Sequence, residues 1–174
     1  MAKVAESLFK FLPAHGWSYF MFKQKEIYLI LDNIRSRENV GSIFRTADAA
    51  GVSKIYLCGI TPTPPHEKIS KTALGAEKTV LWEYRKQTWR CLLELKNKNE
   101  KLKIVGLEQT KTSQNIFKFK PEFPLALVLG NEVKGLSPKI LKYCDKKIAI
   151  PMYGKKENLN VAVAAGIALY QLIK

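Results

Sequence analysis

The sequence has few of the side chains that metal sites and nucleophilic triads require. Its 174 residues include only two histidines, and His15 and His66 lie far apart without neighbouring groups of cysteines or carboxylates. Structural zinc sites use sets of such ligands at short, characteristic spacings. No Ser-His-Asp or Cys-His arrangement is indicated either. We therefore expect neither a metal centre nor a nucleophilic triad.

Cysteines and long apolar runs are also scarce. Cys58, Cys91 and Cys144 are odd in number and widely spaced, and two of them fall in apolar stretches. This pattern favours reduced thiols that pack in a core, so we expect a cytoplasmic protein. No run of 18 apolar residues occurs, and Glu6 and Lys10 interrupt the apolar N-terminal residues. Neither a transmembrane helix nor a signal peptide is predicted.

Two common phosphate-binding motifs are missing. No G-x-G-x-x-G follows a predicted strand, and no G-x-x-x-x-G-K-[ST] occurs. Rossmann-type dinucleotide binding and P-loop nucleotide hydrolysis are therefore not indicated. The sequence also lacks internal repeats, low-complexity segments and an obvious linker, and its length suits one domain with its own core.

Positive charge is what the chain has in excess. Lysine and arginine total 29 against 15 for aspartate and glutamate, which gives a formal net charge of +14. A nucleic acid is the simplest partner, because phosphate contacts and counterion release depend on such charge. A lysine-rich surface that only confers solubility is the alternative. Membrane attachment is disfavoured, since no polybasic run lies beside an apolar anchor.

Apolar runs of strand length alternate with segments of helical pattern. Strands are predicted at 27–31, 54–60, 80–82, 103–107, 125–129 and 147–150, and helices at 39–50, 87–99 and from 159 almost to the end. This alternation predicts an α/β fold with a parallel sheet flanked by helices. We expect the domain to span 27–174. The extension 1–26 carries aromatic residues and lysines that either pack on the domain or stack on bases.

The predicted helix at 39–50 has one apolar and one polar face. The polar face carries Ser42, Arg45 and Asp48 at intervals of three. Arg45 either pairs with Asp48 on a solvated face or points toward a ligand. Asn39, in the first turn, either caps the helix or presents its amide near the end of strand 27–31.

The C-terminal helix is apolar nearly all round. From 159 to 173, only Asn160, Gly166 and Gln171 are not Ala, Val, Leu, Ile or Tyr. Such a helix must be covered on more than one side. Either the core or a subunit interface could provide that cover, and its small residues would permit close approach.

Three blocks of sequence resemble motifs one to three of the SpoU/TrmH branch of the SPOUT RNA methyltransferases. They are ENVGSIFRTADAAGV at 38–52, LALVLGNEVKGLS at 125–137 and IPMYGKKENLNVAVAAGIALY at 150–170. The resemblance extends from about residue 27 to the C-terminus. It implies a deep C-terminal trefoil knot, a homodimer, S-adenosyl-L-methionine as methyl donor and the 2′-hydroxyl of an RNA ribose as acceptor.

The resemblance also implies roles for polar residues of the first two motifs. Arg45 matches the arginine that lies beside the target ribose. A guanidinium is almost always protonated and has no acceptor, so we expect Arg45 to orient the 2′-oxygen and stabilise developing negative charge. Asn39 would help hold the arginine and the RNA backbone. Glu132 would pin Arg45 or the knot loops across the dimer interface, unless it is simply a turn residue on the surface.

Donor binding is implied for four positions that end strands or follow a loop. Leu107, Gly130, Ile150 and Leu159 match the family's contacts to the donor, which are largely made by backbone atoms. Gly130 would in addition allow close approach of the donor to the backbone.

Motif three departs from the family pattern at one position. Asn158 stands where the family usually has serine, whereas Asn160 matches the expected asparagine. We expect Asn158 still to cap the final helix and form a hydrogen bond, so donor binding should survive.

The sequence thus predicts an S-adenosylmethionine-dependent RNA ribose 2′-O-methyltransferase that acts on tRNA. An rRNA methyltransferase and a catalytically impaired RNA-binding homologue are the alternatives. The Asn39 and Arg45 pair speaks against a base methyltransferase. Lysines expected to contact RNA phosphates are Lys68, Lys71, Lys78, Lys118 and Lys120.

Overall fold

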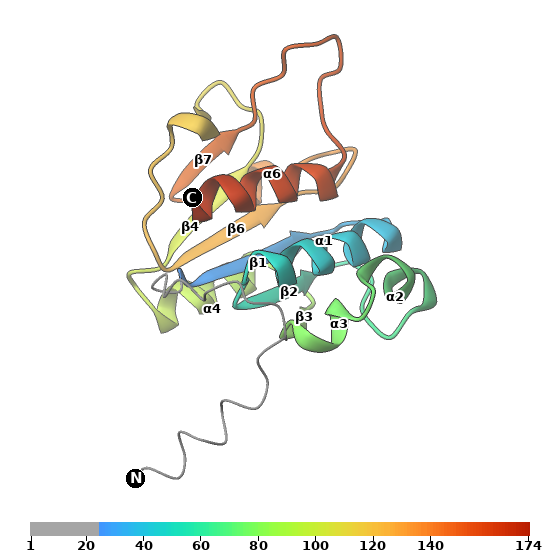
Figure 1. Ribbon diagram of the computed structural model, residues 1–174. Helices are drawn as coiled ribbons and strands as arrows, with labels where there is room; N and C mark the ends of the chain where they lie inside the picture. The colour runs from blue at the N-terminus through green and yellow to red at the C-terminus, as the bar shows by residue number, and fades with distance from the viewer. Residues whose placement is uncertain (1–24) are drawn as a thin grey trace, which may run out of the picture.

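Seven parallel strands form one sheet in the order β3-β2-β1-β6-β4-β7-β5 in the computed structural model, which describes residues 25–174 (Figure 1). The strands are β1 (Ile27–Asp32), β2 (Lys54–Cys58), β3 (Trp82–Arg85), β4 (Lys103–Leu107), β5 (Gln114–Asn115), β6 (Leu125–Leu129) and β7 (Lys146–Ala149). The parallel α/β prediction is confirmed. The predictions for residues 1–24 lie outside the described part of the chain.

Helices cover both faces of this sheet. They are α1 (Arg37–Ala49), α2 (Glu67–Ala73), α3 (Ala76–Thr79), α4 (Thr88–Lys98), α5 (Pro138–Leu141) and α6 (Val161–Ile173), with a 3-10 turn η2 (Ile116–Lys118). Figure 1 shows α1 and α6 next to each other in front of the sheet, with α4 behind it. In the described residues, no helix is long and apolar enough to cross a lipid bilayer.

The central strands are buried on both faces, as their continuous apolar runs predict. Leu29 and Leu31 of β1 belong to the core that includes α1 and α6, whereas Ile30 belongs to the core that includes α4 and α5. Successive side chains of a strand point to opposite faces. A strand covered by helices on both sides must therefore be apolar at every position.

Helix α1 begins two residues before the predicted start because Ser36 caps it. The Ser36 hydroxyl accepts a hydrogen bond from the Asn39 backbone N–H at 3.1 Å. Asn39 is therefore not the cap, and its side chain remains free for other contacts. Gly51, in the left-handed conformation, follows the last turn as predicted.

Three short elements were not predicted from the sequence. Helices α2 and α3 occupy the segment between β2 and β3, and the two-residue strand β5 extends the sheet beyond β7. Helix α2 packs closely on α1 at Gly41, where a Cβ would lie 2.0 Å from the Thr72 Oγ1 and 2.3 Å from the Ile69 carbonyl oxygen. Only glycine allows these two helices to approach so closely.

The connections bring three C-terminal loops to one edge of the sheet. Strand β6 inserts between β1 and β4, and β7 pairs with the other side of β4. All three strands run in the same direction, so the loops that follow β4, β6 and β7 leave at the same edge. In open α/β sheets, this edge is where ligands bind.

Candidate active site

A cavity of about 330 Å³ lies at the carboxyl ends of β4, β6 and β7. Its walls come from 107–109, from 129–135 and from a set of residues between 150 and 164. The four positions predicted to bind the donor, Leu107, Gly130, Ile150 and Leu159, all line it. The structure thus brings together backbone from three loops that are far apart in sequence, in a cavity whose volume suits a small ligand.

Glu108, which the sequence analysis did not select, fixes one wall of this cavity. Its carboxylate accepts hydrogen bonds from the backbone N–H groups of Leu136, at 2.5 Å, and Gln109, at 3.1 Å. Gly135 has a φ of +61°, and a Cβ there would lie 2.2 Å from a Glu108 carboxylate oxygen. A carboxylate directly after a buried strand was the available signal, because polar groups at strand exits form ligand sites.

Gly130 is required by the backbone of its own loop, and the predicted close approach of a donor stays a prediction. A Cβ at this position would lie 2.4 Å from the Gly135 carbonyl carbon and 2.5 Å from the Leu136 nitrogen. The loop after β6 folds back on itself, with a bridge between Asn131 and Gly135. Glycine is therefore already required by the loop's own backbone, before any ligand is considered.

A chain of side-chain hydrogen bonds joins all three predicted motifs. The Asn39 amide donates to the Glu132 carboxylate at 3.1 Å, and the Asn160 amide donates to the Asn39 Oδ1 at 3.0 Å. Glu132 also accepts from the backbone N–H groups of Arg35 and Ser36 at 3.0 to 3.2 Å. The start of α1, the loop after β6 and the start of α6 are thus held in a fixed arrangement.

These contacts set the ionisation of Glu132. Burial alone would raise the pKa of this carboxyl, but hydrogen bonds from the backbone amides of Arg35 and Ser36, together with the Asn39 amide, lower it below its usual range. The stabilisation from this group is therefore present at neutral pH and is lost as the pH falls through the lowered pKa. Glu132 is neither a free surface residue nor bound to Arg45 within this chain.

Arg45 is exposed on α1 and does not line the cavity. Within residues 25–174, its guanidinium forms no hydrogen bond or ion pair, and the alternative pair with Asp48 does not form. Asp48 instead accepts a hydrogen bond from the Thr79 hydroxyl at 2.7 Å. The neighbouring residue Thr46 faces Gly166 of α6. Arg45 is therefore next to the α1–α6 contact and open to a partner.

Asn160, and not Asn158, caps the final helix. Asn160 caps α6, because its side-chain oxygen accepts from the backbone N–H groups of Ala162 and Val163 at 2.9 and 3.3 Å. The prediction that Asn158 caps this helix was wrong, since the helix begins two residues later. Asn158 is exposed and lines the cavity.

The charged side chains that line the cavity are mostly negative, whereas the whole protein carries a net positive charge. Glu108, Glu132 and Glu157 lie in its wall, against a single cation, Lys134. The rest of the lining is backbone, aliphatic side chains, Met152 and the amide side chains of Gln109, Asn131 and Asn158. Such a site suits a ligand that combines apolar surface, hydrogen-bonding groups and positive charge, which a sulfonium nucleoside has.

The lysines predicted to contact RNA phosphates are spread over the molecule. Lys68 and Lys71 lie on α2 and Lys78 on α3, whereas Lys118 and Lys120 lie near η2. No group of three or more His, Cys, Asp or Glu side chains within 25–174 is arranged to hold a metal ion.

The fold and the cavity define an α/β protein that binds a small ligand at the carboxyl edge of a parallel sheet, between loops of its C-terminal half. The chain belongs to the SpoU rRNA Methylase family, whose sequence model matches residues 26–170. The resemblance of the three motifs is thereby confirmed.

Two relatives and one solved structure show the range of similar proteins. The tRNA (guanosine(18)-2′-O)-methyltransferase of Aquifex aeolicus is 39% identical over 150 residues, which cover 86% of this chain and 69% of that protein. The 23S rRNA (guanosine-2′-O-)-methyltransferase RlmB of Haemophilus influenzae is 34% identical over 87% of this chain and 61% of its own. The AdoMet-bound rRNA methyltransferase of Sinorhizobium meliloti superposes with a TM-score of 0.77 and 28% identity over 85% of this chain and 56% of its own.

Proposed function

We propose that this protein transfers a methyl group from S-adenosyl-L-methionine to the 2′-hydroxyl of a ribose in RNA. The observation that carries the proposal is the convergence of Leu107, Gly130, Ile150 and Leu159 on one cavity, next to the hydrogen-bonded chain from Glu132 to Asn160. The similar Aquifex and Haemophilus proteins are named as 2′-O-methyltransferases of tRNA and 23S rRNA. We propose tRNA as the substrate and rRNA as the alternative.

The residues present fit the donor. Backbone groups of the loops after β4, β6 and β7 would hold its polar atoms, and the aliphatic side chains of Leu107, Ile150 and Leu159 would cover its apolar surface. The carboxylates of Glu108 and Glu132 favour a cationic ligand in a protein that otherwise repels cations. When bound, the donor supplies an electrophilic methyl group on sulfur.

Most of the protein's contribution to such a reaction is positioning. Asn39, Glu132 and Asn160 hold the start of α1 against the loops of the cavity. Arg45, two turns further along α1, would orient the ribose 2′-oxygen and stabilise its developing negative charge. Because a guanidinium has no free lone pair to accept a proton, we assign it an electrostatic role.

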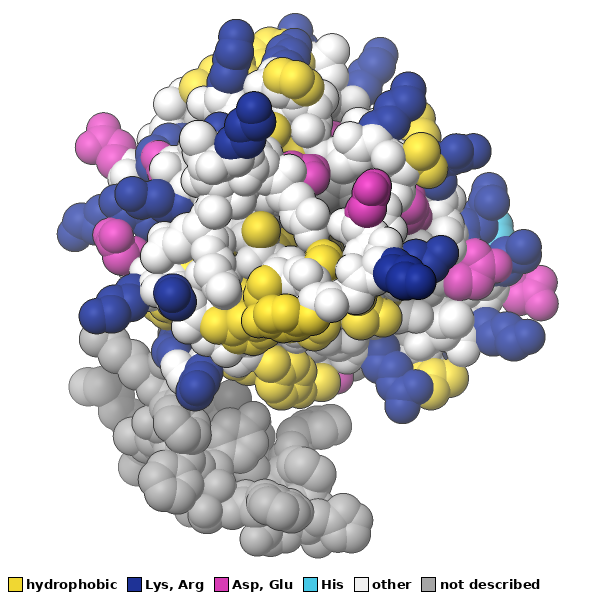
Figure 2. Space-filling model, turned by 90° about the horizontal axis from the view of Figure 1, so that it is seen from above, with side chains coloured by type: hydrophobic (Ala, Val, Ile, Leu, Met, Phe, Trp, Pro, Cys, Tyr) yellow, Lys and Arg dark blue, Asp and Glu magenta, His cyan; other side chains and the backbone are white. Residues whose placement is uncertain are grey.

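A homodimer is part of the proposal. Along α6 and the segment before it, the apolar side chains of Leu159, Val163 and Tyr170 are 37%, 52% and 54% exposed. Figure 2 shows hydrophobic side chains gathered in a band on this side of the molecule, between scattered lysines and arginines. A second copy on this face would bury the band and enclose the surroundings of Arg45. Helix α1 packs against α6 within the chain, so Arg45 of α1 lies beside this face.

The trefoil knot and the cytoplasmic location also remain proposals. The knot is supported by the path of the chain, which leaves β7, forms a wall of the cavity with the loops after β4 and β6, and returns to pack α6 on α1 (Figure 1). The location rests on the reduced, buried Cys58 and Cys91.

The proposed function is tested by replacing Arg45. Arg45→Ala should lower kcat for methylation of a tRNA transcript by about 10²-fold or more, as expected when a group that stabilises developing charge is lost. Donor affinity, measured by calorimetry, should stay within a few-fold, because Arg45 does not line the cavity. Ser42→Ala on the same helix face is the matched control. Full activity of Arg45→Ala would remove Arg45 from the mechanism.

The catalytically impaired alternative rests on Asn158, which lines the cavity where the family usually has serine. Asn158→Ser should leave methylation unchanged or improve it if the asparagine is only a tolerated change. Failure of the unmodified protein to bind S-adenosyl-L-methionine at millimolar concentration would favour an RNA-binding role without catalysis. Mapping of 2′-O-methyl marks in total RNA, with and without the protein, would separate tRNA from rRNA.

A further inference from the structure

A second cavity, of about 360 Å³, lies near the amino ends of β4 and β7, at the edge of the sheet opposite the candidate active site. We call it the lysine cleft, after the four lysines in its lining. It is lined by Lys103, Val105, Gln114, Lys118, Phe119, Lys120, Glu122, Asp145 and Lys146. The three motifs do not include this region, although Lys118 and Lys120 are among the lysines expected from the sequence to contact RNA phosphates.

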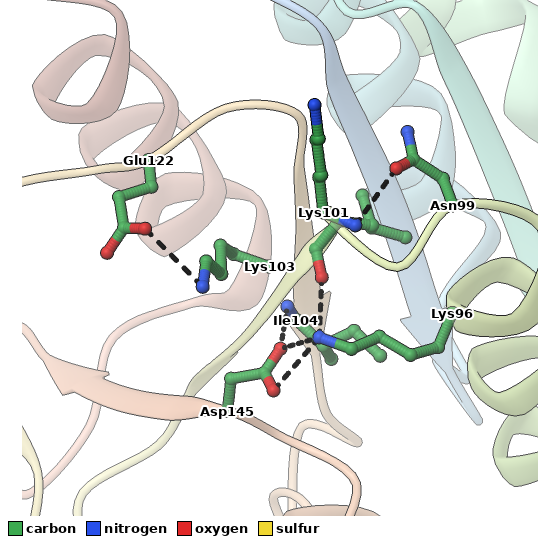
Figure 3. A network of polar contacts seen from close by, with 8 residues as sticks. Lys96, Asn99, Lys101, Lys103, Ile104, Glu122 and Asp145 are labelled. Atoms are coloured by element: carbon green, nitrogen blue, oxygen red, sulfur yellow. Dashed lines mark hydrogen bonds and ion pairs between the residues drawn. The ribbon is translucent and has the colours of Figure 1, made fainter.

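The two carboxylates of the cleft are already engaged by other groups. Figure 3 shows Asp145 accepting from the Lys96 ammonium, at 2.8 and 3.0 Å, and from the Ile104 backbone N–H, at 2.8 Å. Glu122 lies 3.4 Å from the Lys103 ammonium. Asp145 therefore joins the end of α4 to the start of β4, and Glu122 offsets one lysine of the cleft.

Three lysines of the cleft remain without a carboxylate partner in residues 25–174. Lys118 ends η2, Lys120 follows in the segment that leads to β6, and Lys146 begins β7. All three are exposed. Keeping like charges together around one hollow is unfavourable unless an anion occupies it. The cleft thus has the charge of a phosphate-binding surface, whereas the charged side chains that line the candidate active site are three carboxylates and one lysine.

The composition of the cleft indicates which phosphate compound it takes. Lysines are flexible point charges that neutralise phosphates without fixing their geometry, and the lining has no arginine that could bind a phosphate in bidentate fashion. Such contacts position a nucleic acid backbone and carry no sequence information. A site for a free nucleotide would need hydrogen-bond donors held in a fixed geometry, which the flexible lysines of the cleft do not provide.

We propose that the lysine cleft binds the phosphodiester backbone of the RNA substrate, as a second contact remote from the methylated ribose. This inference rests on the proposed function for the identity of the RNA. Five-residue strands separate the two edges of the sheet by roughly 16 Å, at about 3.3 Å per residue. An RNA must therefore span at least this distance along the protein surface to contact both sites.

The test compares two triple variants of the full chain with equal loss of charge. Lys118→Gln, Lys120→Gln and Lys146→Gln together remove the unpaired lysines of the cleft. Lys86→Gln, Lys98→Gln and Lys142→Gln remove three exposed lysines without ion pairs in the described residues, outside the cleft lining. All six side chains are exposed, so both variants should unfold at the temperature of the unmodified protein.

Binding of a full-length tRNA transcript is measured at several salt concentrations. In a plot of log affinity against log salt concentration, the slope for the cleft variant should be smaller in magnitude by about 2 to 3. Each lost phosphate contact removes roughly 0.7 to 0.9 from that slope. The control variant should keep the slope of the unmodified protein. In methylation assays, the cleft variant should raise KM for tRNA and leave kcat and donor affinity unchanged.

Equal slopes and equal tRNA affinities for the two variants would overturn the proposal. So would saturable binding of inorganic phosphate in the cleft with unchanged RNA affinity, which would indicate a small anion as its ligand. RNA binding is measured independently of methylation. If the cleft variant shows a smaller salt slope but the unmodified protein transfers no methyl group, the RNA-binding cleft is supported and only the proposed function is contradicted.

Discussion

At the scale of single residues, the Glu108 carboxylate is the contact that most directly shapes the donor cavity. It binds two backbone N–H groups, on Leu136 and Gln109. An amide in its place would turn an NH2 group toward one of them and remove the charge from both hydrogen bonds. Hydrogen bonds to a charged group contribute about 1.5–3 kcal/mol each.

We therefore expect Glu108→Gln to weaken binding of S-adenosyl-L-methionine by about 10-fold or more, since 1.4 kcal/mol corresponds to a factor of ten. Calorimetric titration of the purified protein would measure this. Glu100→Gln, at an exposed position outside the cavity, is the control. Donor affinity that is the same in the Glu108 variant and the control would show that the loop holds its shape without this carboxylate.

Asp32, at the end of β1, is a buried carboxyl that is only 4% exposed. Burial raises its pKa, and hydrogen bonds from Thr88 and Asn33 only partly offset this effect. A raised pKa means that folding favours the neutral form. Below the ordinary aspartate pKa, Asp32 is neutral in both the folded and the unfolded state, so its burial does not lower stability there. Stability falls as the pH rises through the raised pKa.

We expect Asp32→Asn to remove this decline in stability. Both recorded donors point to one carboxylate oxygen, which the amide oxygen can replace. Thermal unfolding from about pH 4, near the ordinary aspartate pKa, to about pH 8 would compare the two proteins. The variant should gain stability relative to the unmodified protein as the pH rises. If the difference in stability between the two proteins stayed constant over this pH range, Asp32 would not titrate within it.

Residues that end buried strands could be predicted from the sequence, because an apolar run predicts where its strand stops. Leu107, Gly130 and Ile150 lie at or just after such ends, but their assignment to donor binding came from the resemblance of the motifs. The structure places them together in the cavity. The partners of Asp32 and Glu108 could not be predicted. Thr88 and Leu136 lie 56 and 28 residues away, and no local pattern records such contacts.

At the scale of elements, two glycines offer a matched pair of tests. A Cβ at Gly41 of α1 would overlap the Thr72 hydroxyl and the Ile69 carbonyl of α2, whereas a Cβ at Gly166 of α6 would make an ordinary contact of 3.6 Å with Thr46. The first glycine is required by a helix crossing, and the second is not required by its surroundings.

Gly41→Ala should lower the free energy of unfolding by about 1–3 kcal/mol, the usual cost of overpacking. Gly166→Ala should leave it unchanged or raise it by up to about 1 kcal/mol, because alanine favours helix more than glycine does. Chemical denaturation of both variants would measure these changes. Equal destabilisation of the two would mean that α1 and α2 can move apart freely.

The longer elements followed from hydrophobic pattern and the shorter ones did not. Strands β4 and β6 were predicted with the observed bounds, because runs of apolar or small residues, four after Lys103 in β4 and five in β6, are typical of a strand covered on both faces. Helix α3 and strand β5 have four and two residues, which is about one period of a helix or strand and too short for a reliable pattern. Their structure is decided by the contacts they make with α1, α2 and β7.

At the scale of the whole molecule, the proposed dimer depends on the exposed apolar side chains of α6. Val163→Glu would place a charge in the middle of that band and should yield a monomer of 19.8 kDa by light scattering. Leu93→Glu on α4, which is 44% exposed and belongs to the other face of the sheet, should leave the dimer intact. A dimeric Val163 variant would place the interface elsewhere.

The hydrogen-bonded chain from Glu132 through Asn39 to Asn160 also has a consequence for biosynthesis. Its members are separated by 93 and 121 positions along the polypeptide. During translation, the early strands and their lysines leave the ribosome long before the segment that caps α6. A nascent chain can therefore meet nearby RNA with its basic surface while the catalytic arrangement is still incomplete, and methylation must wait until the last helix has been synthesised and docked.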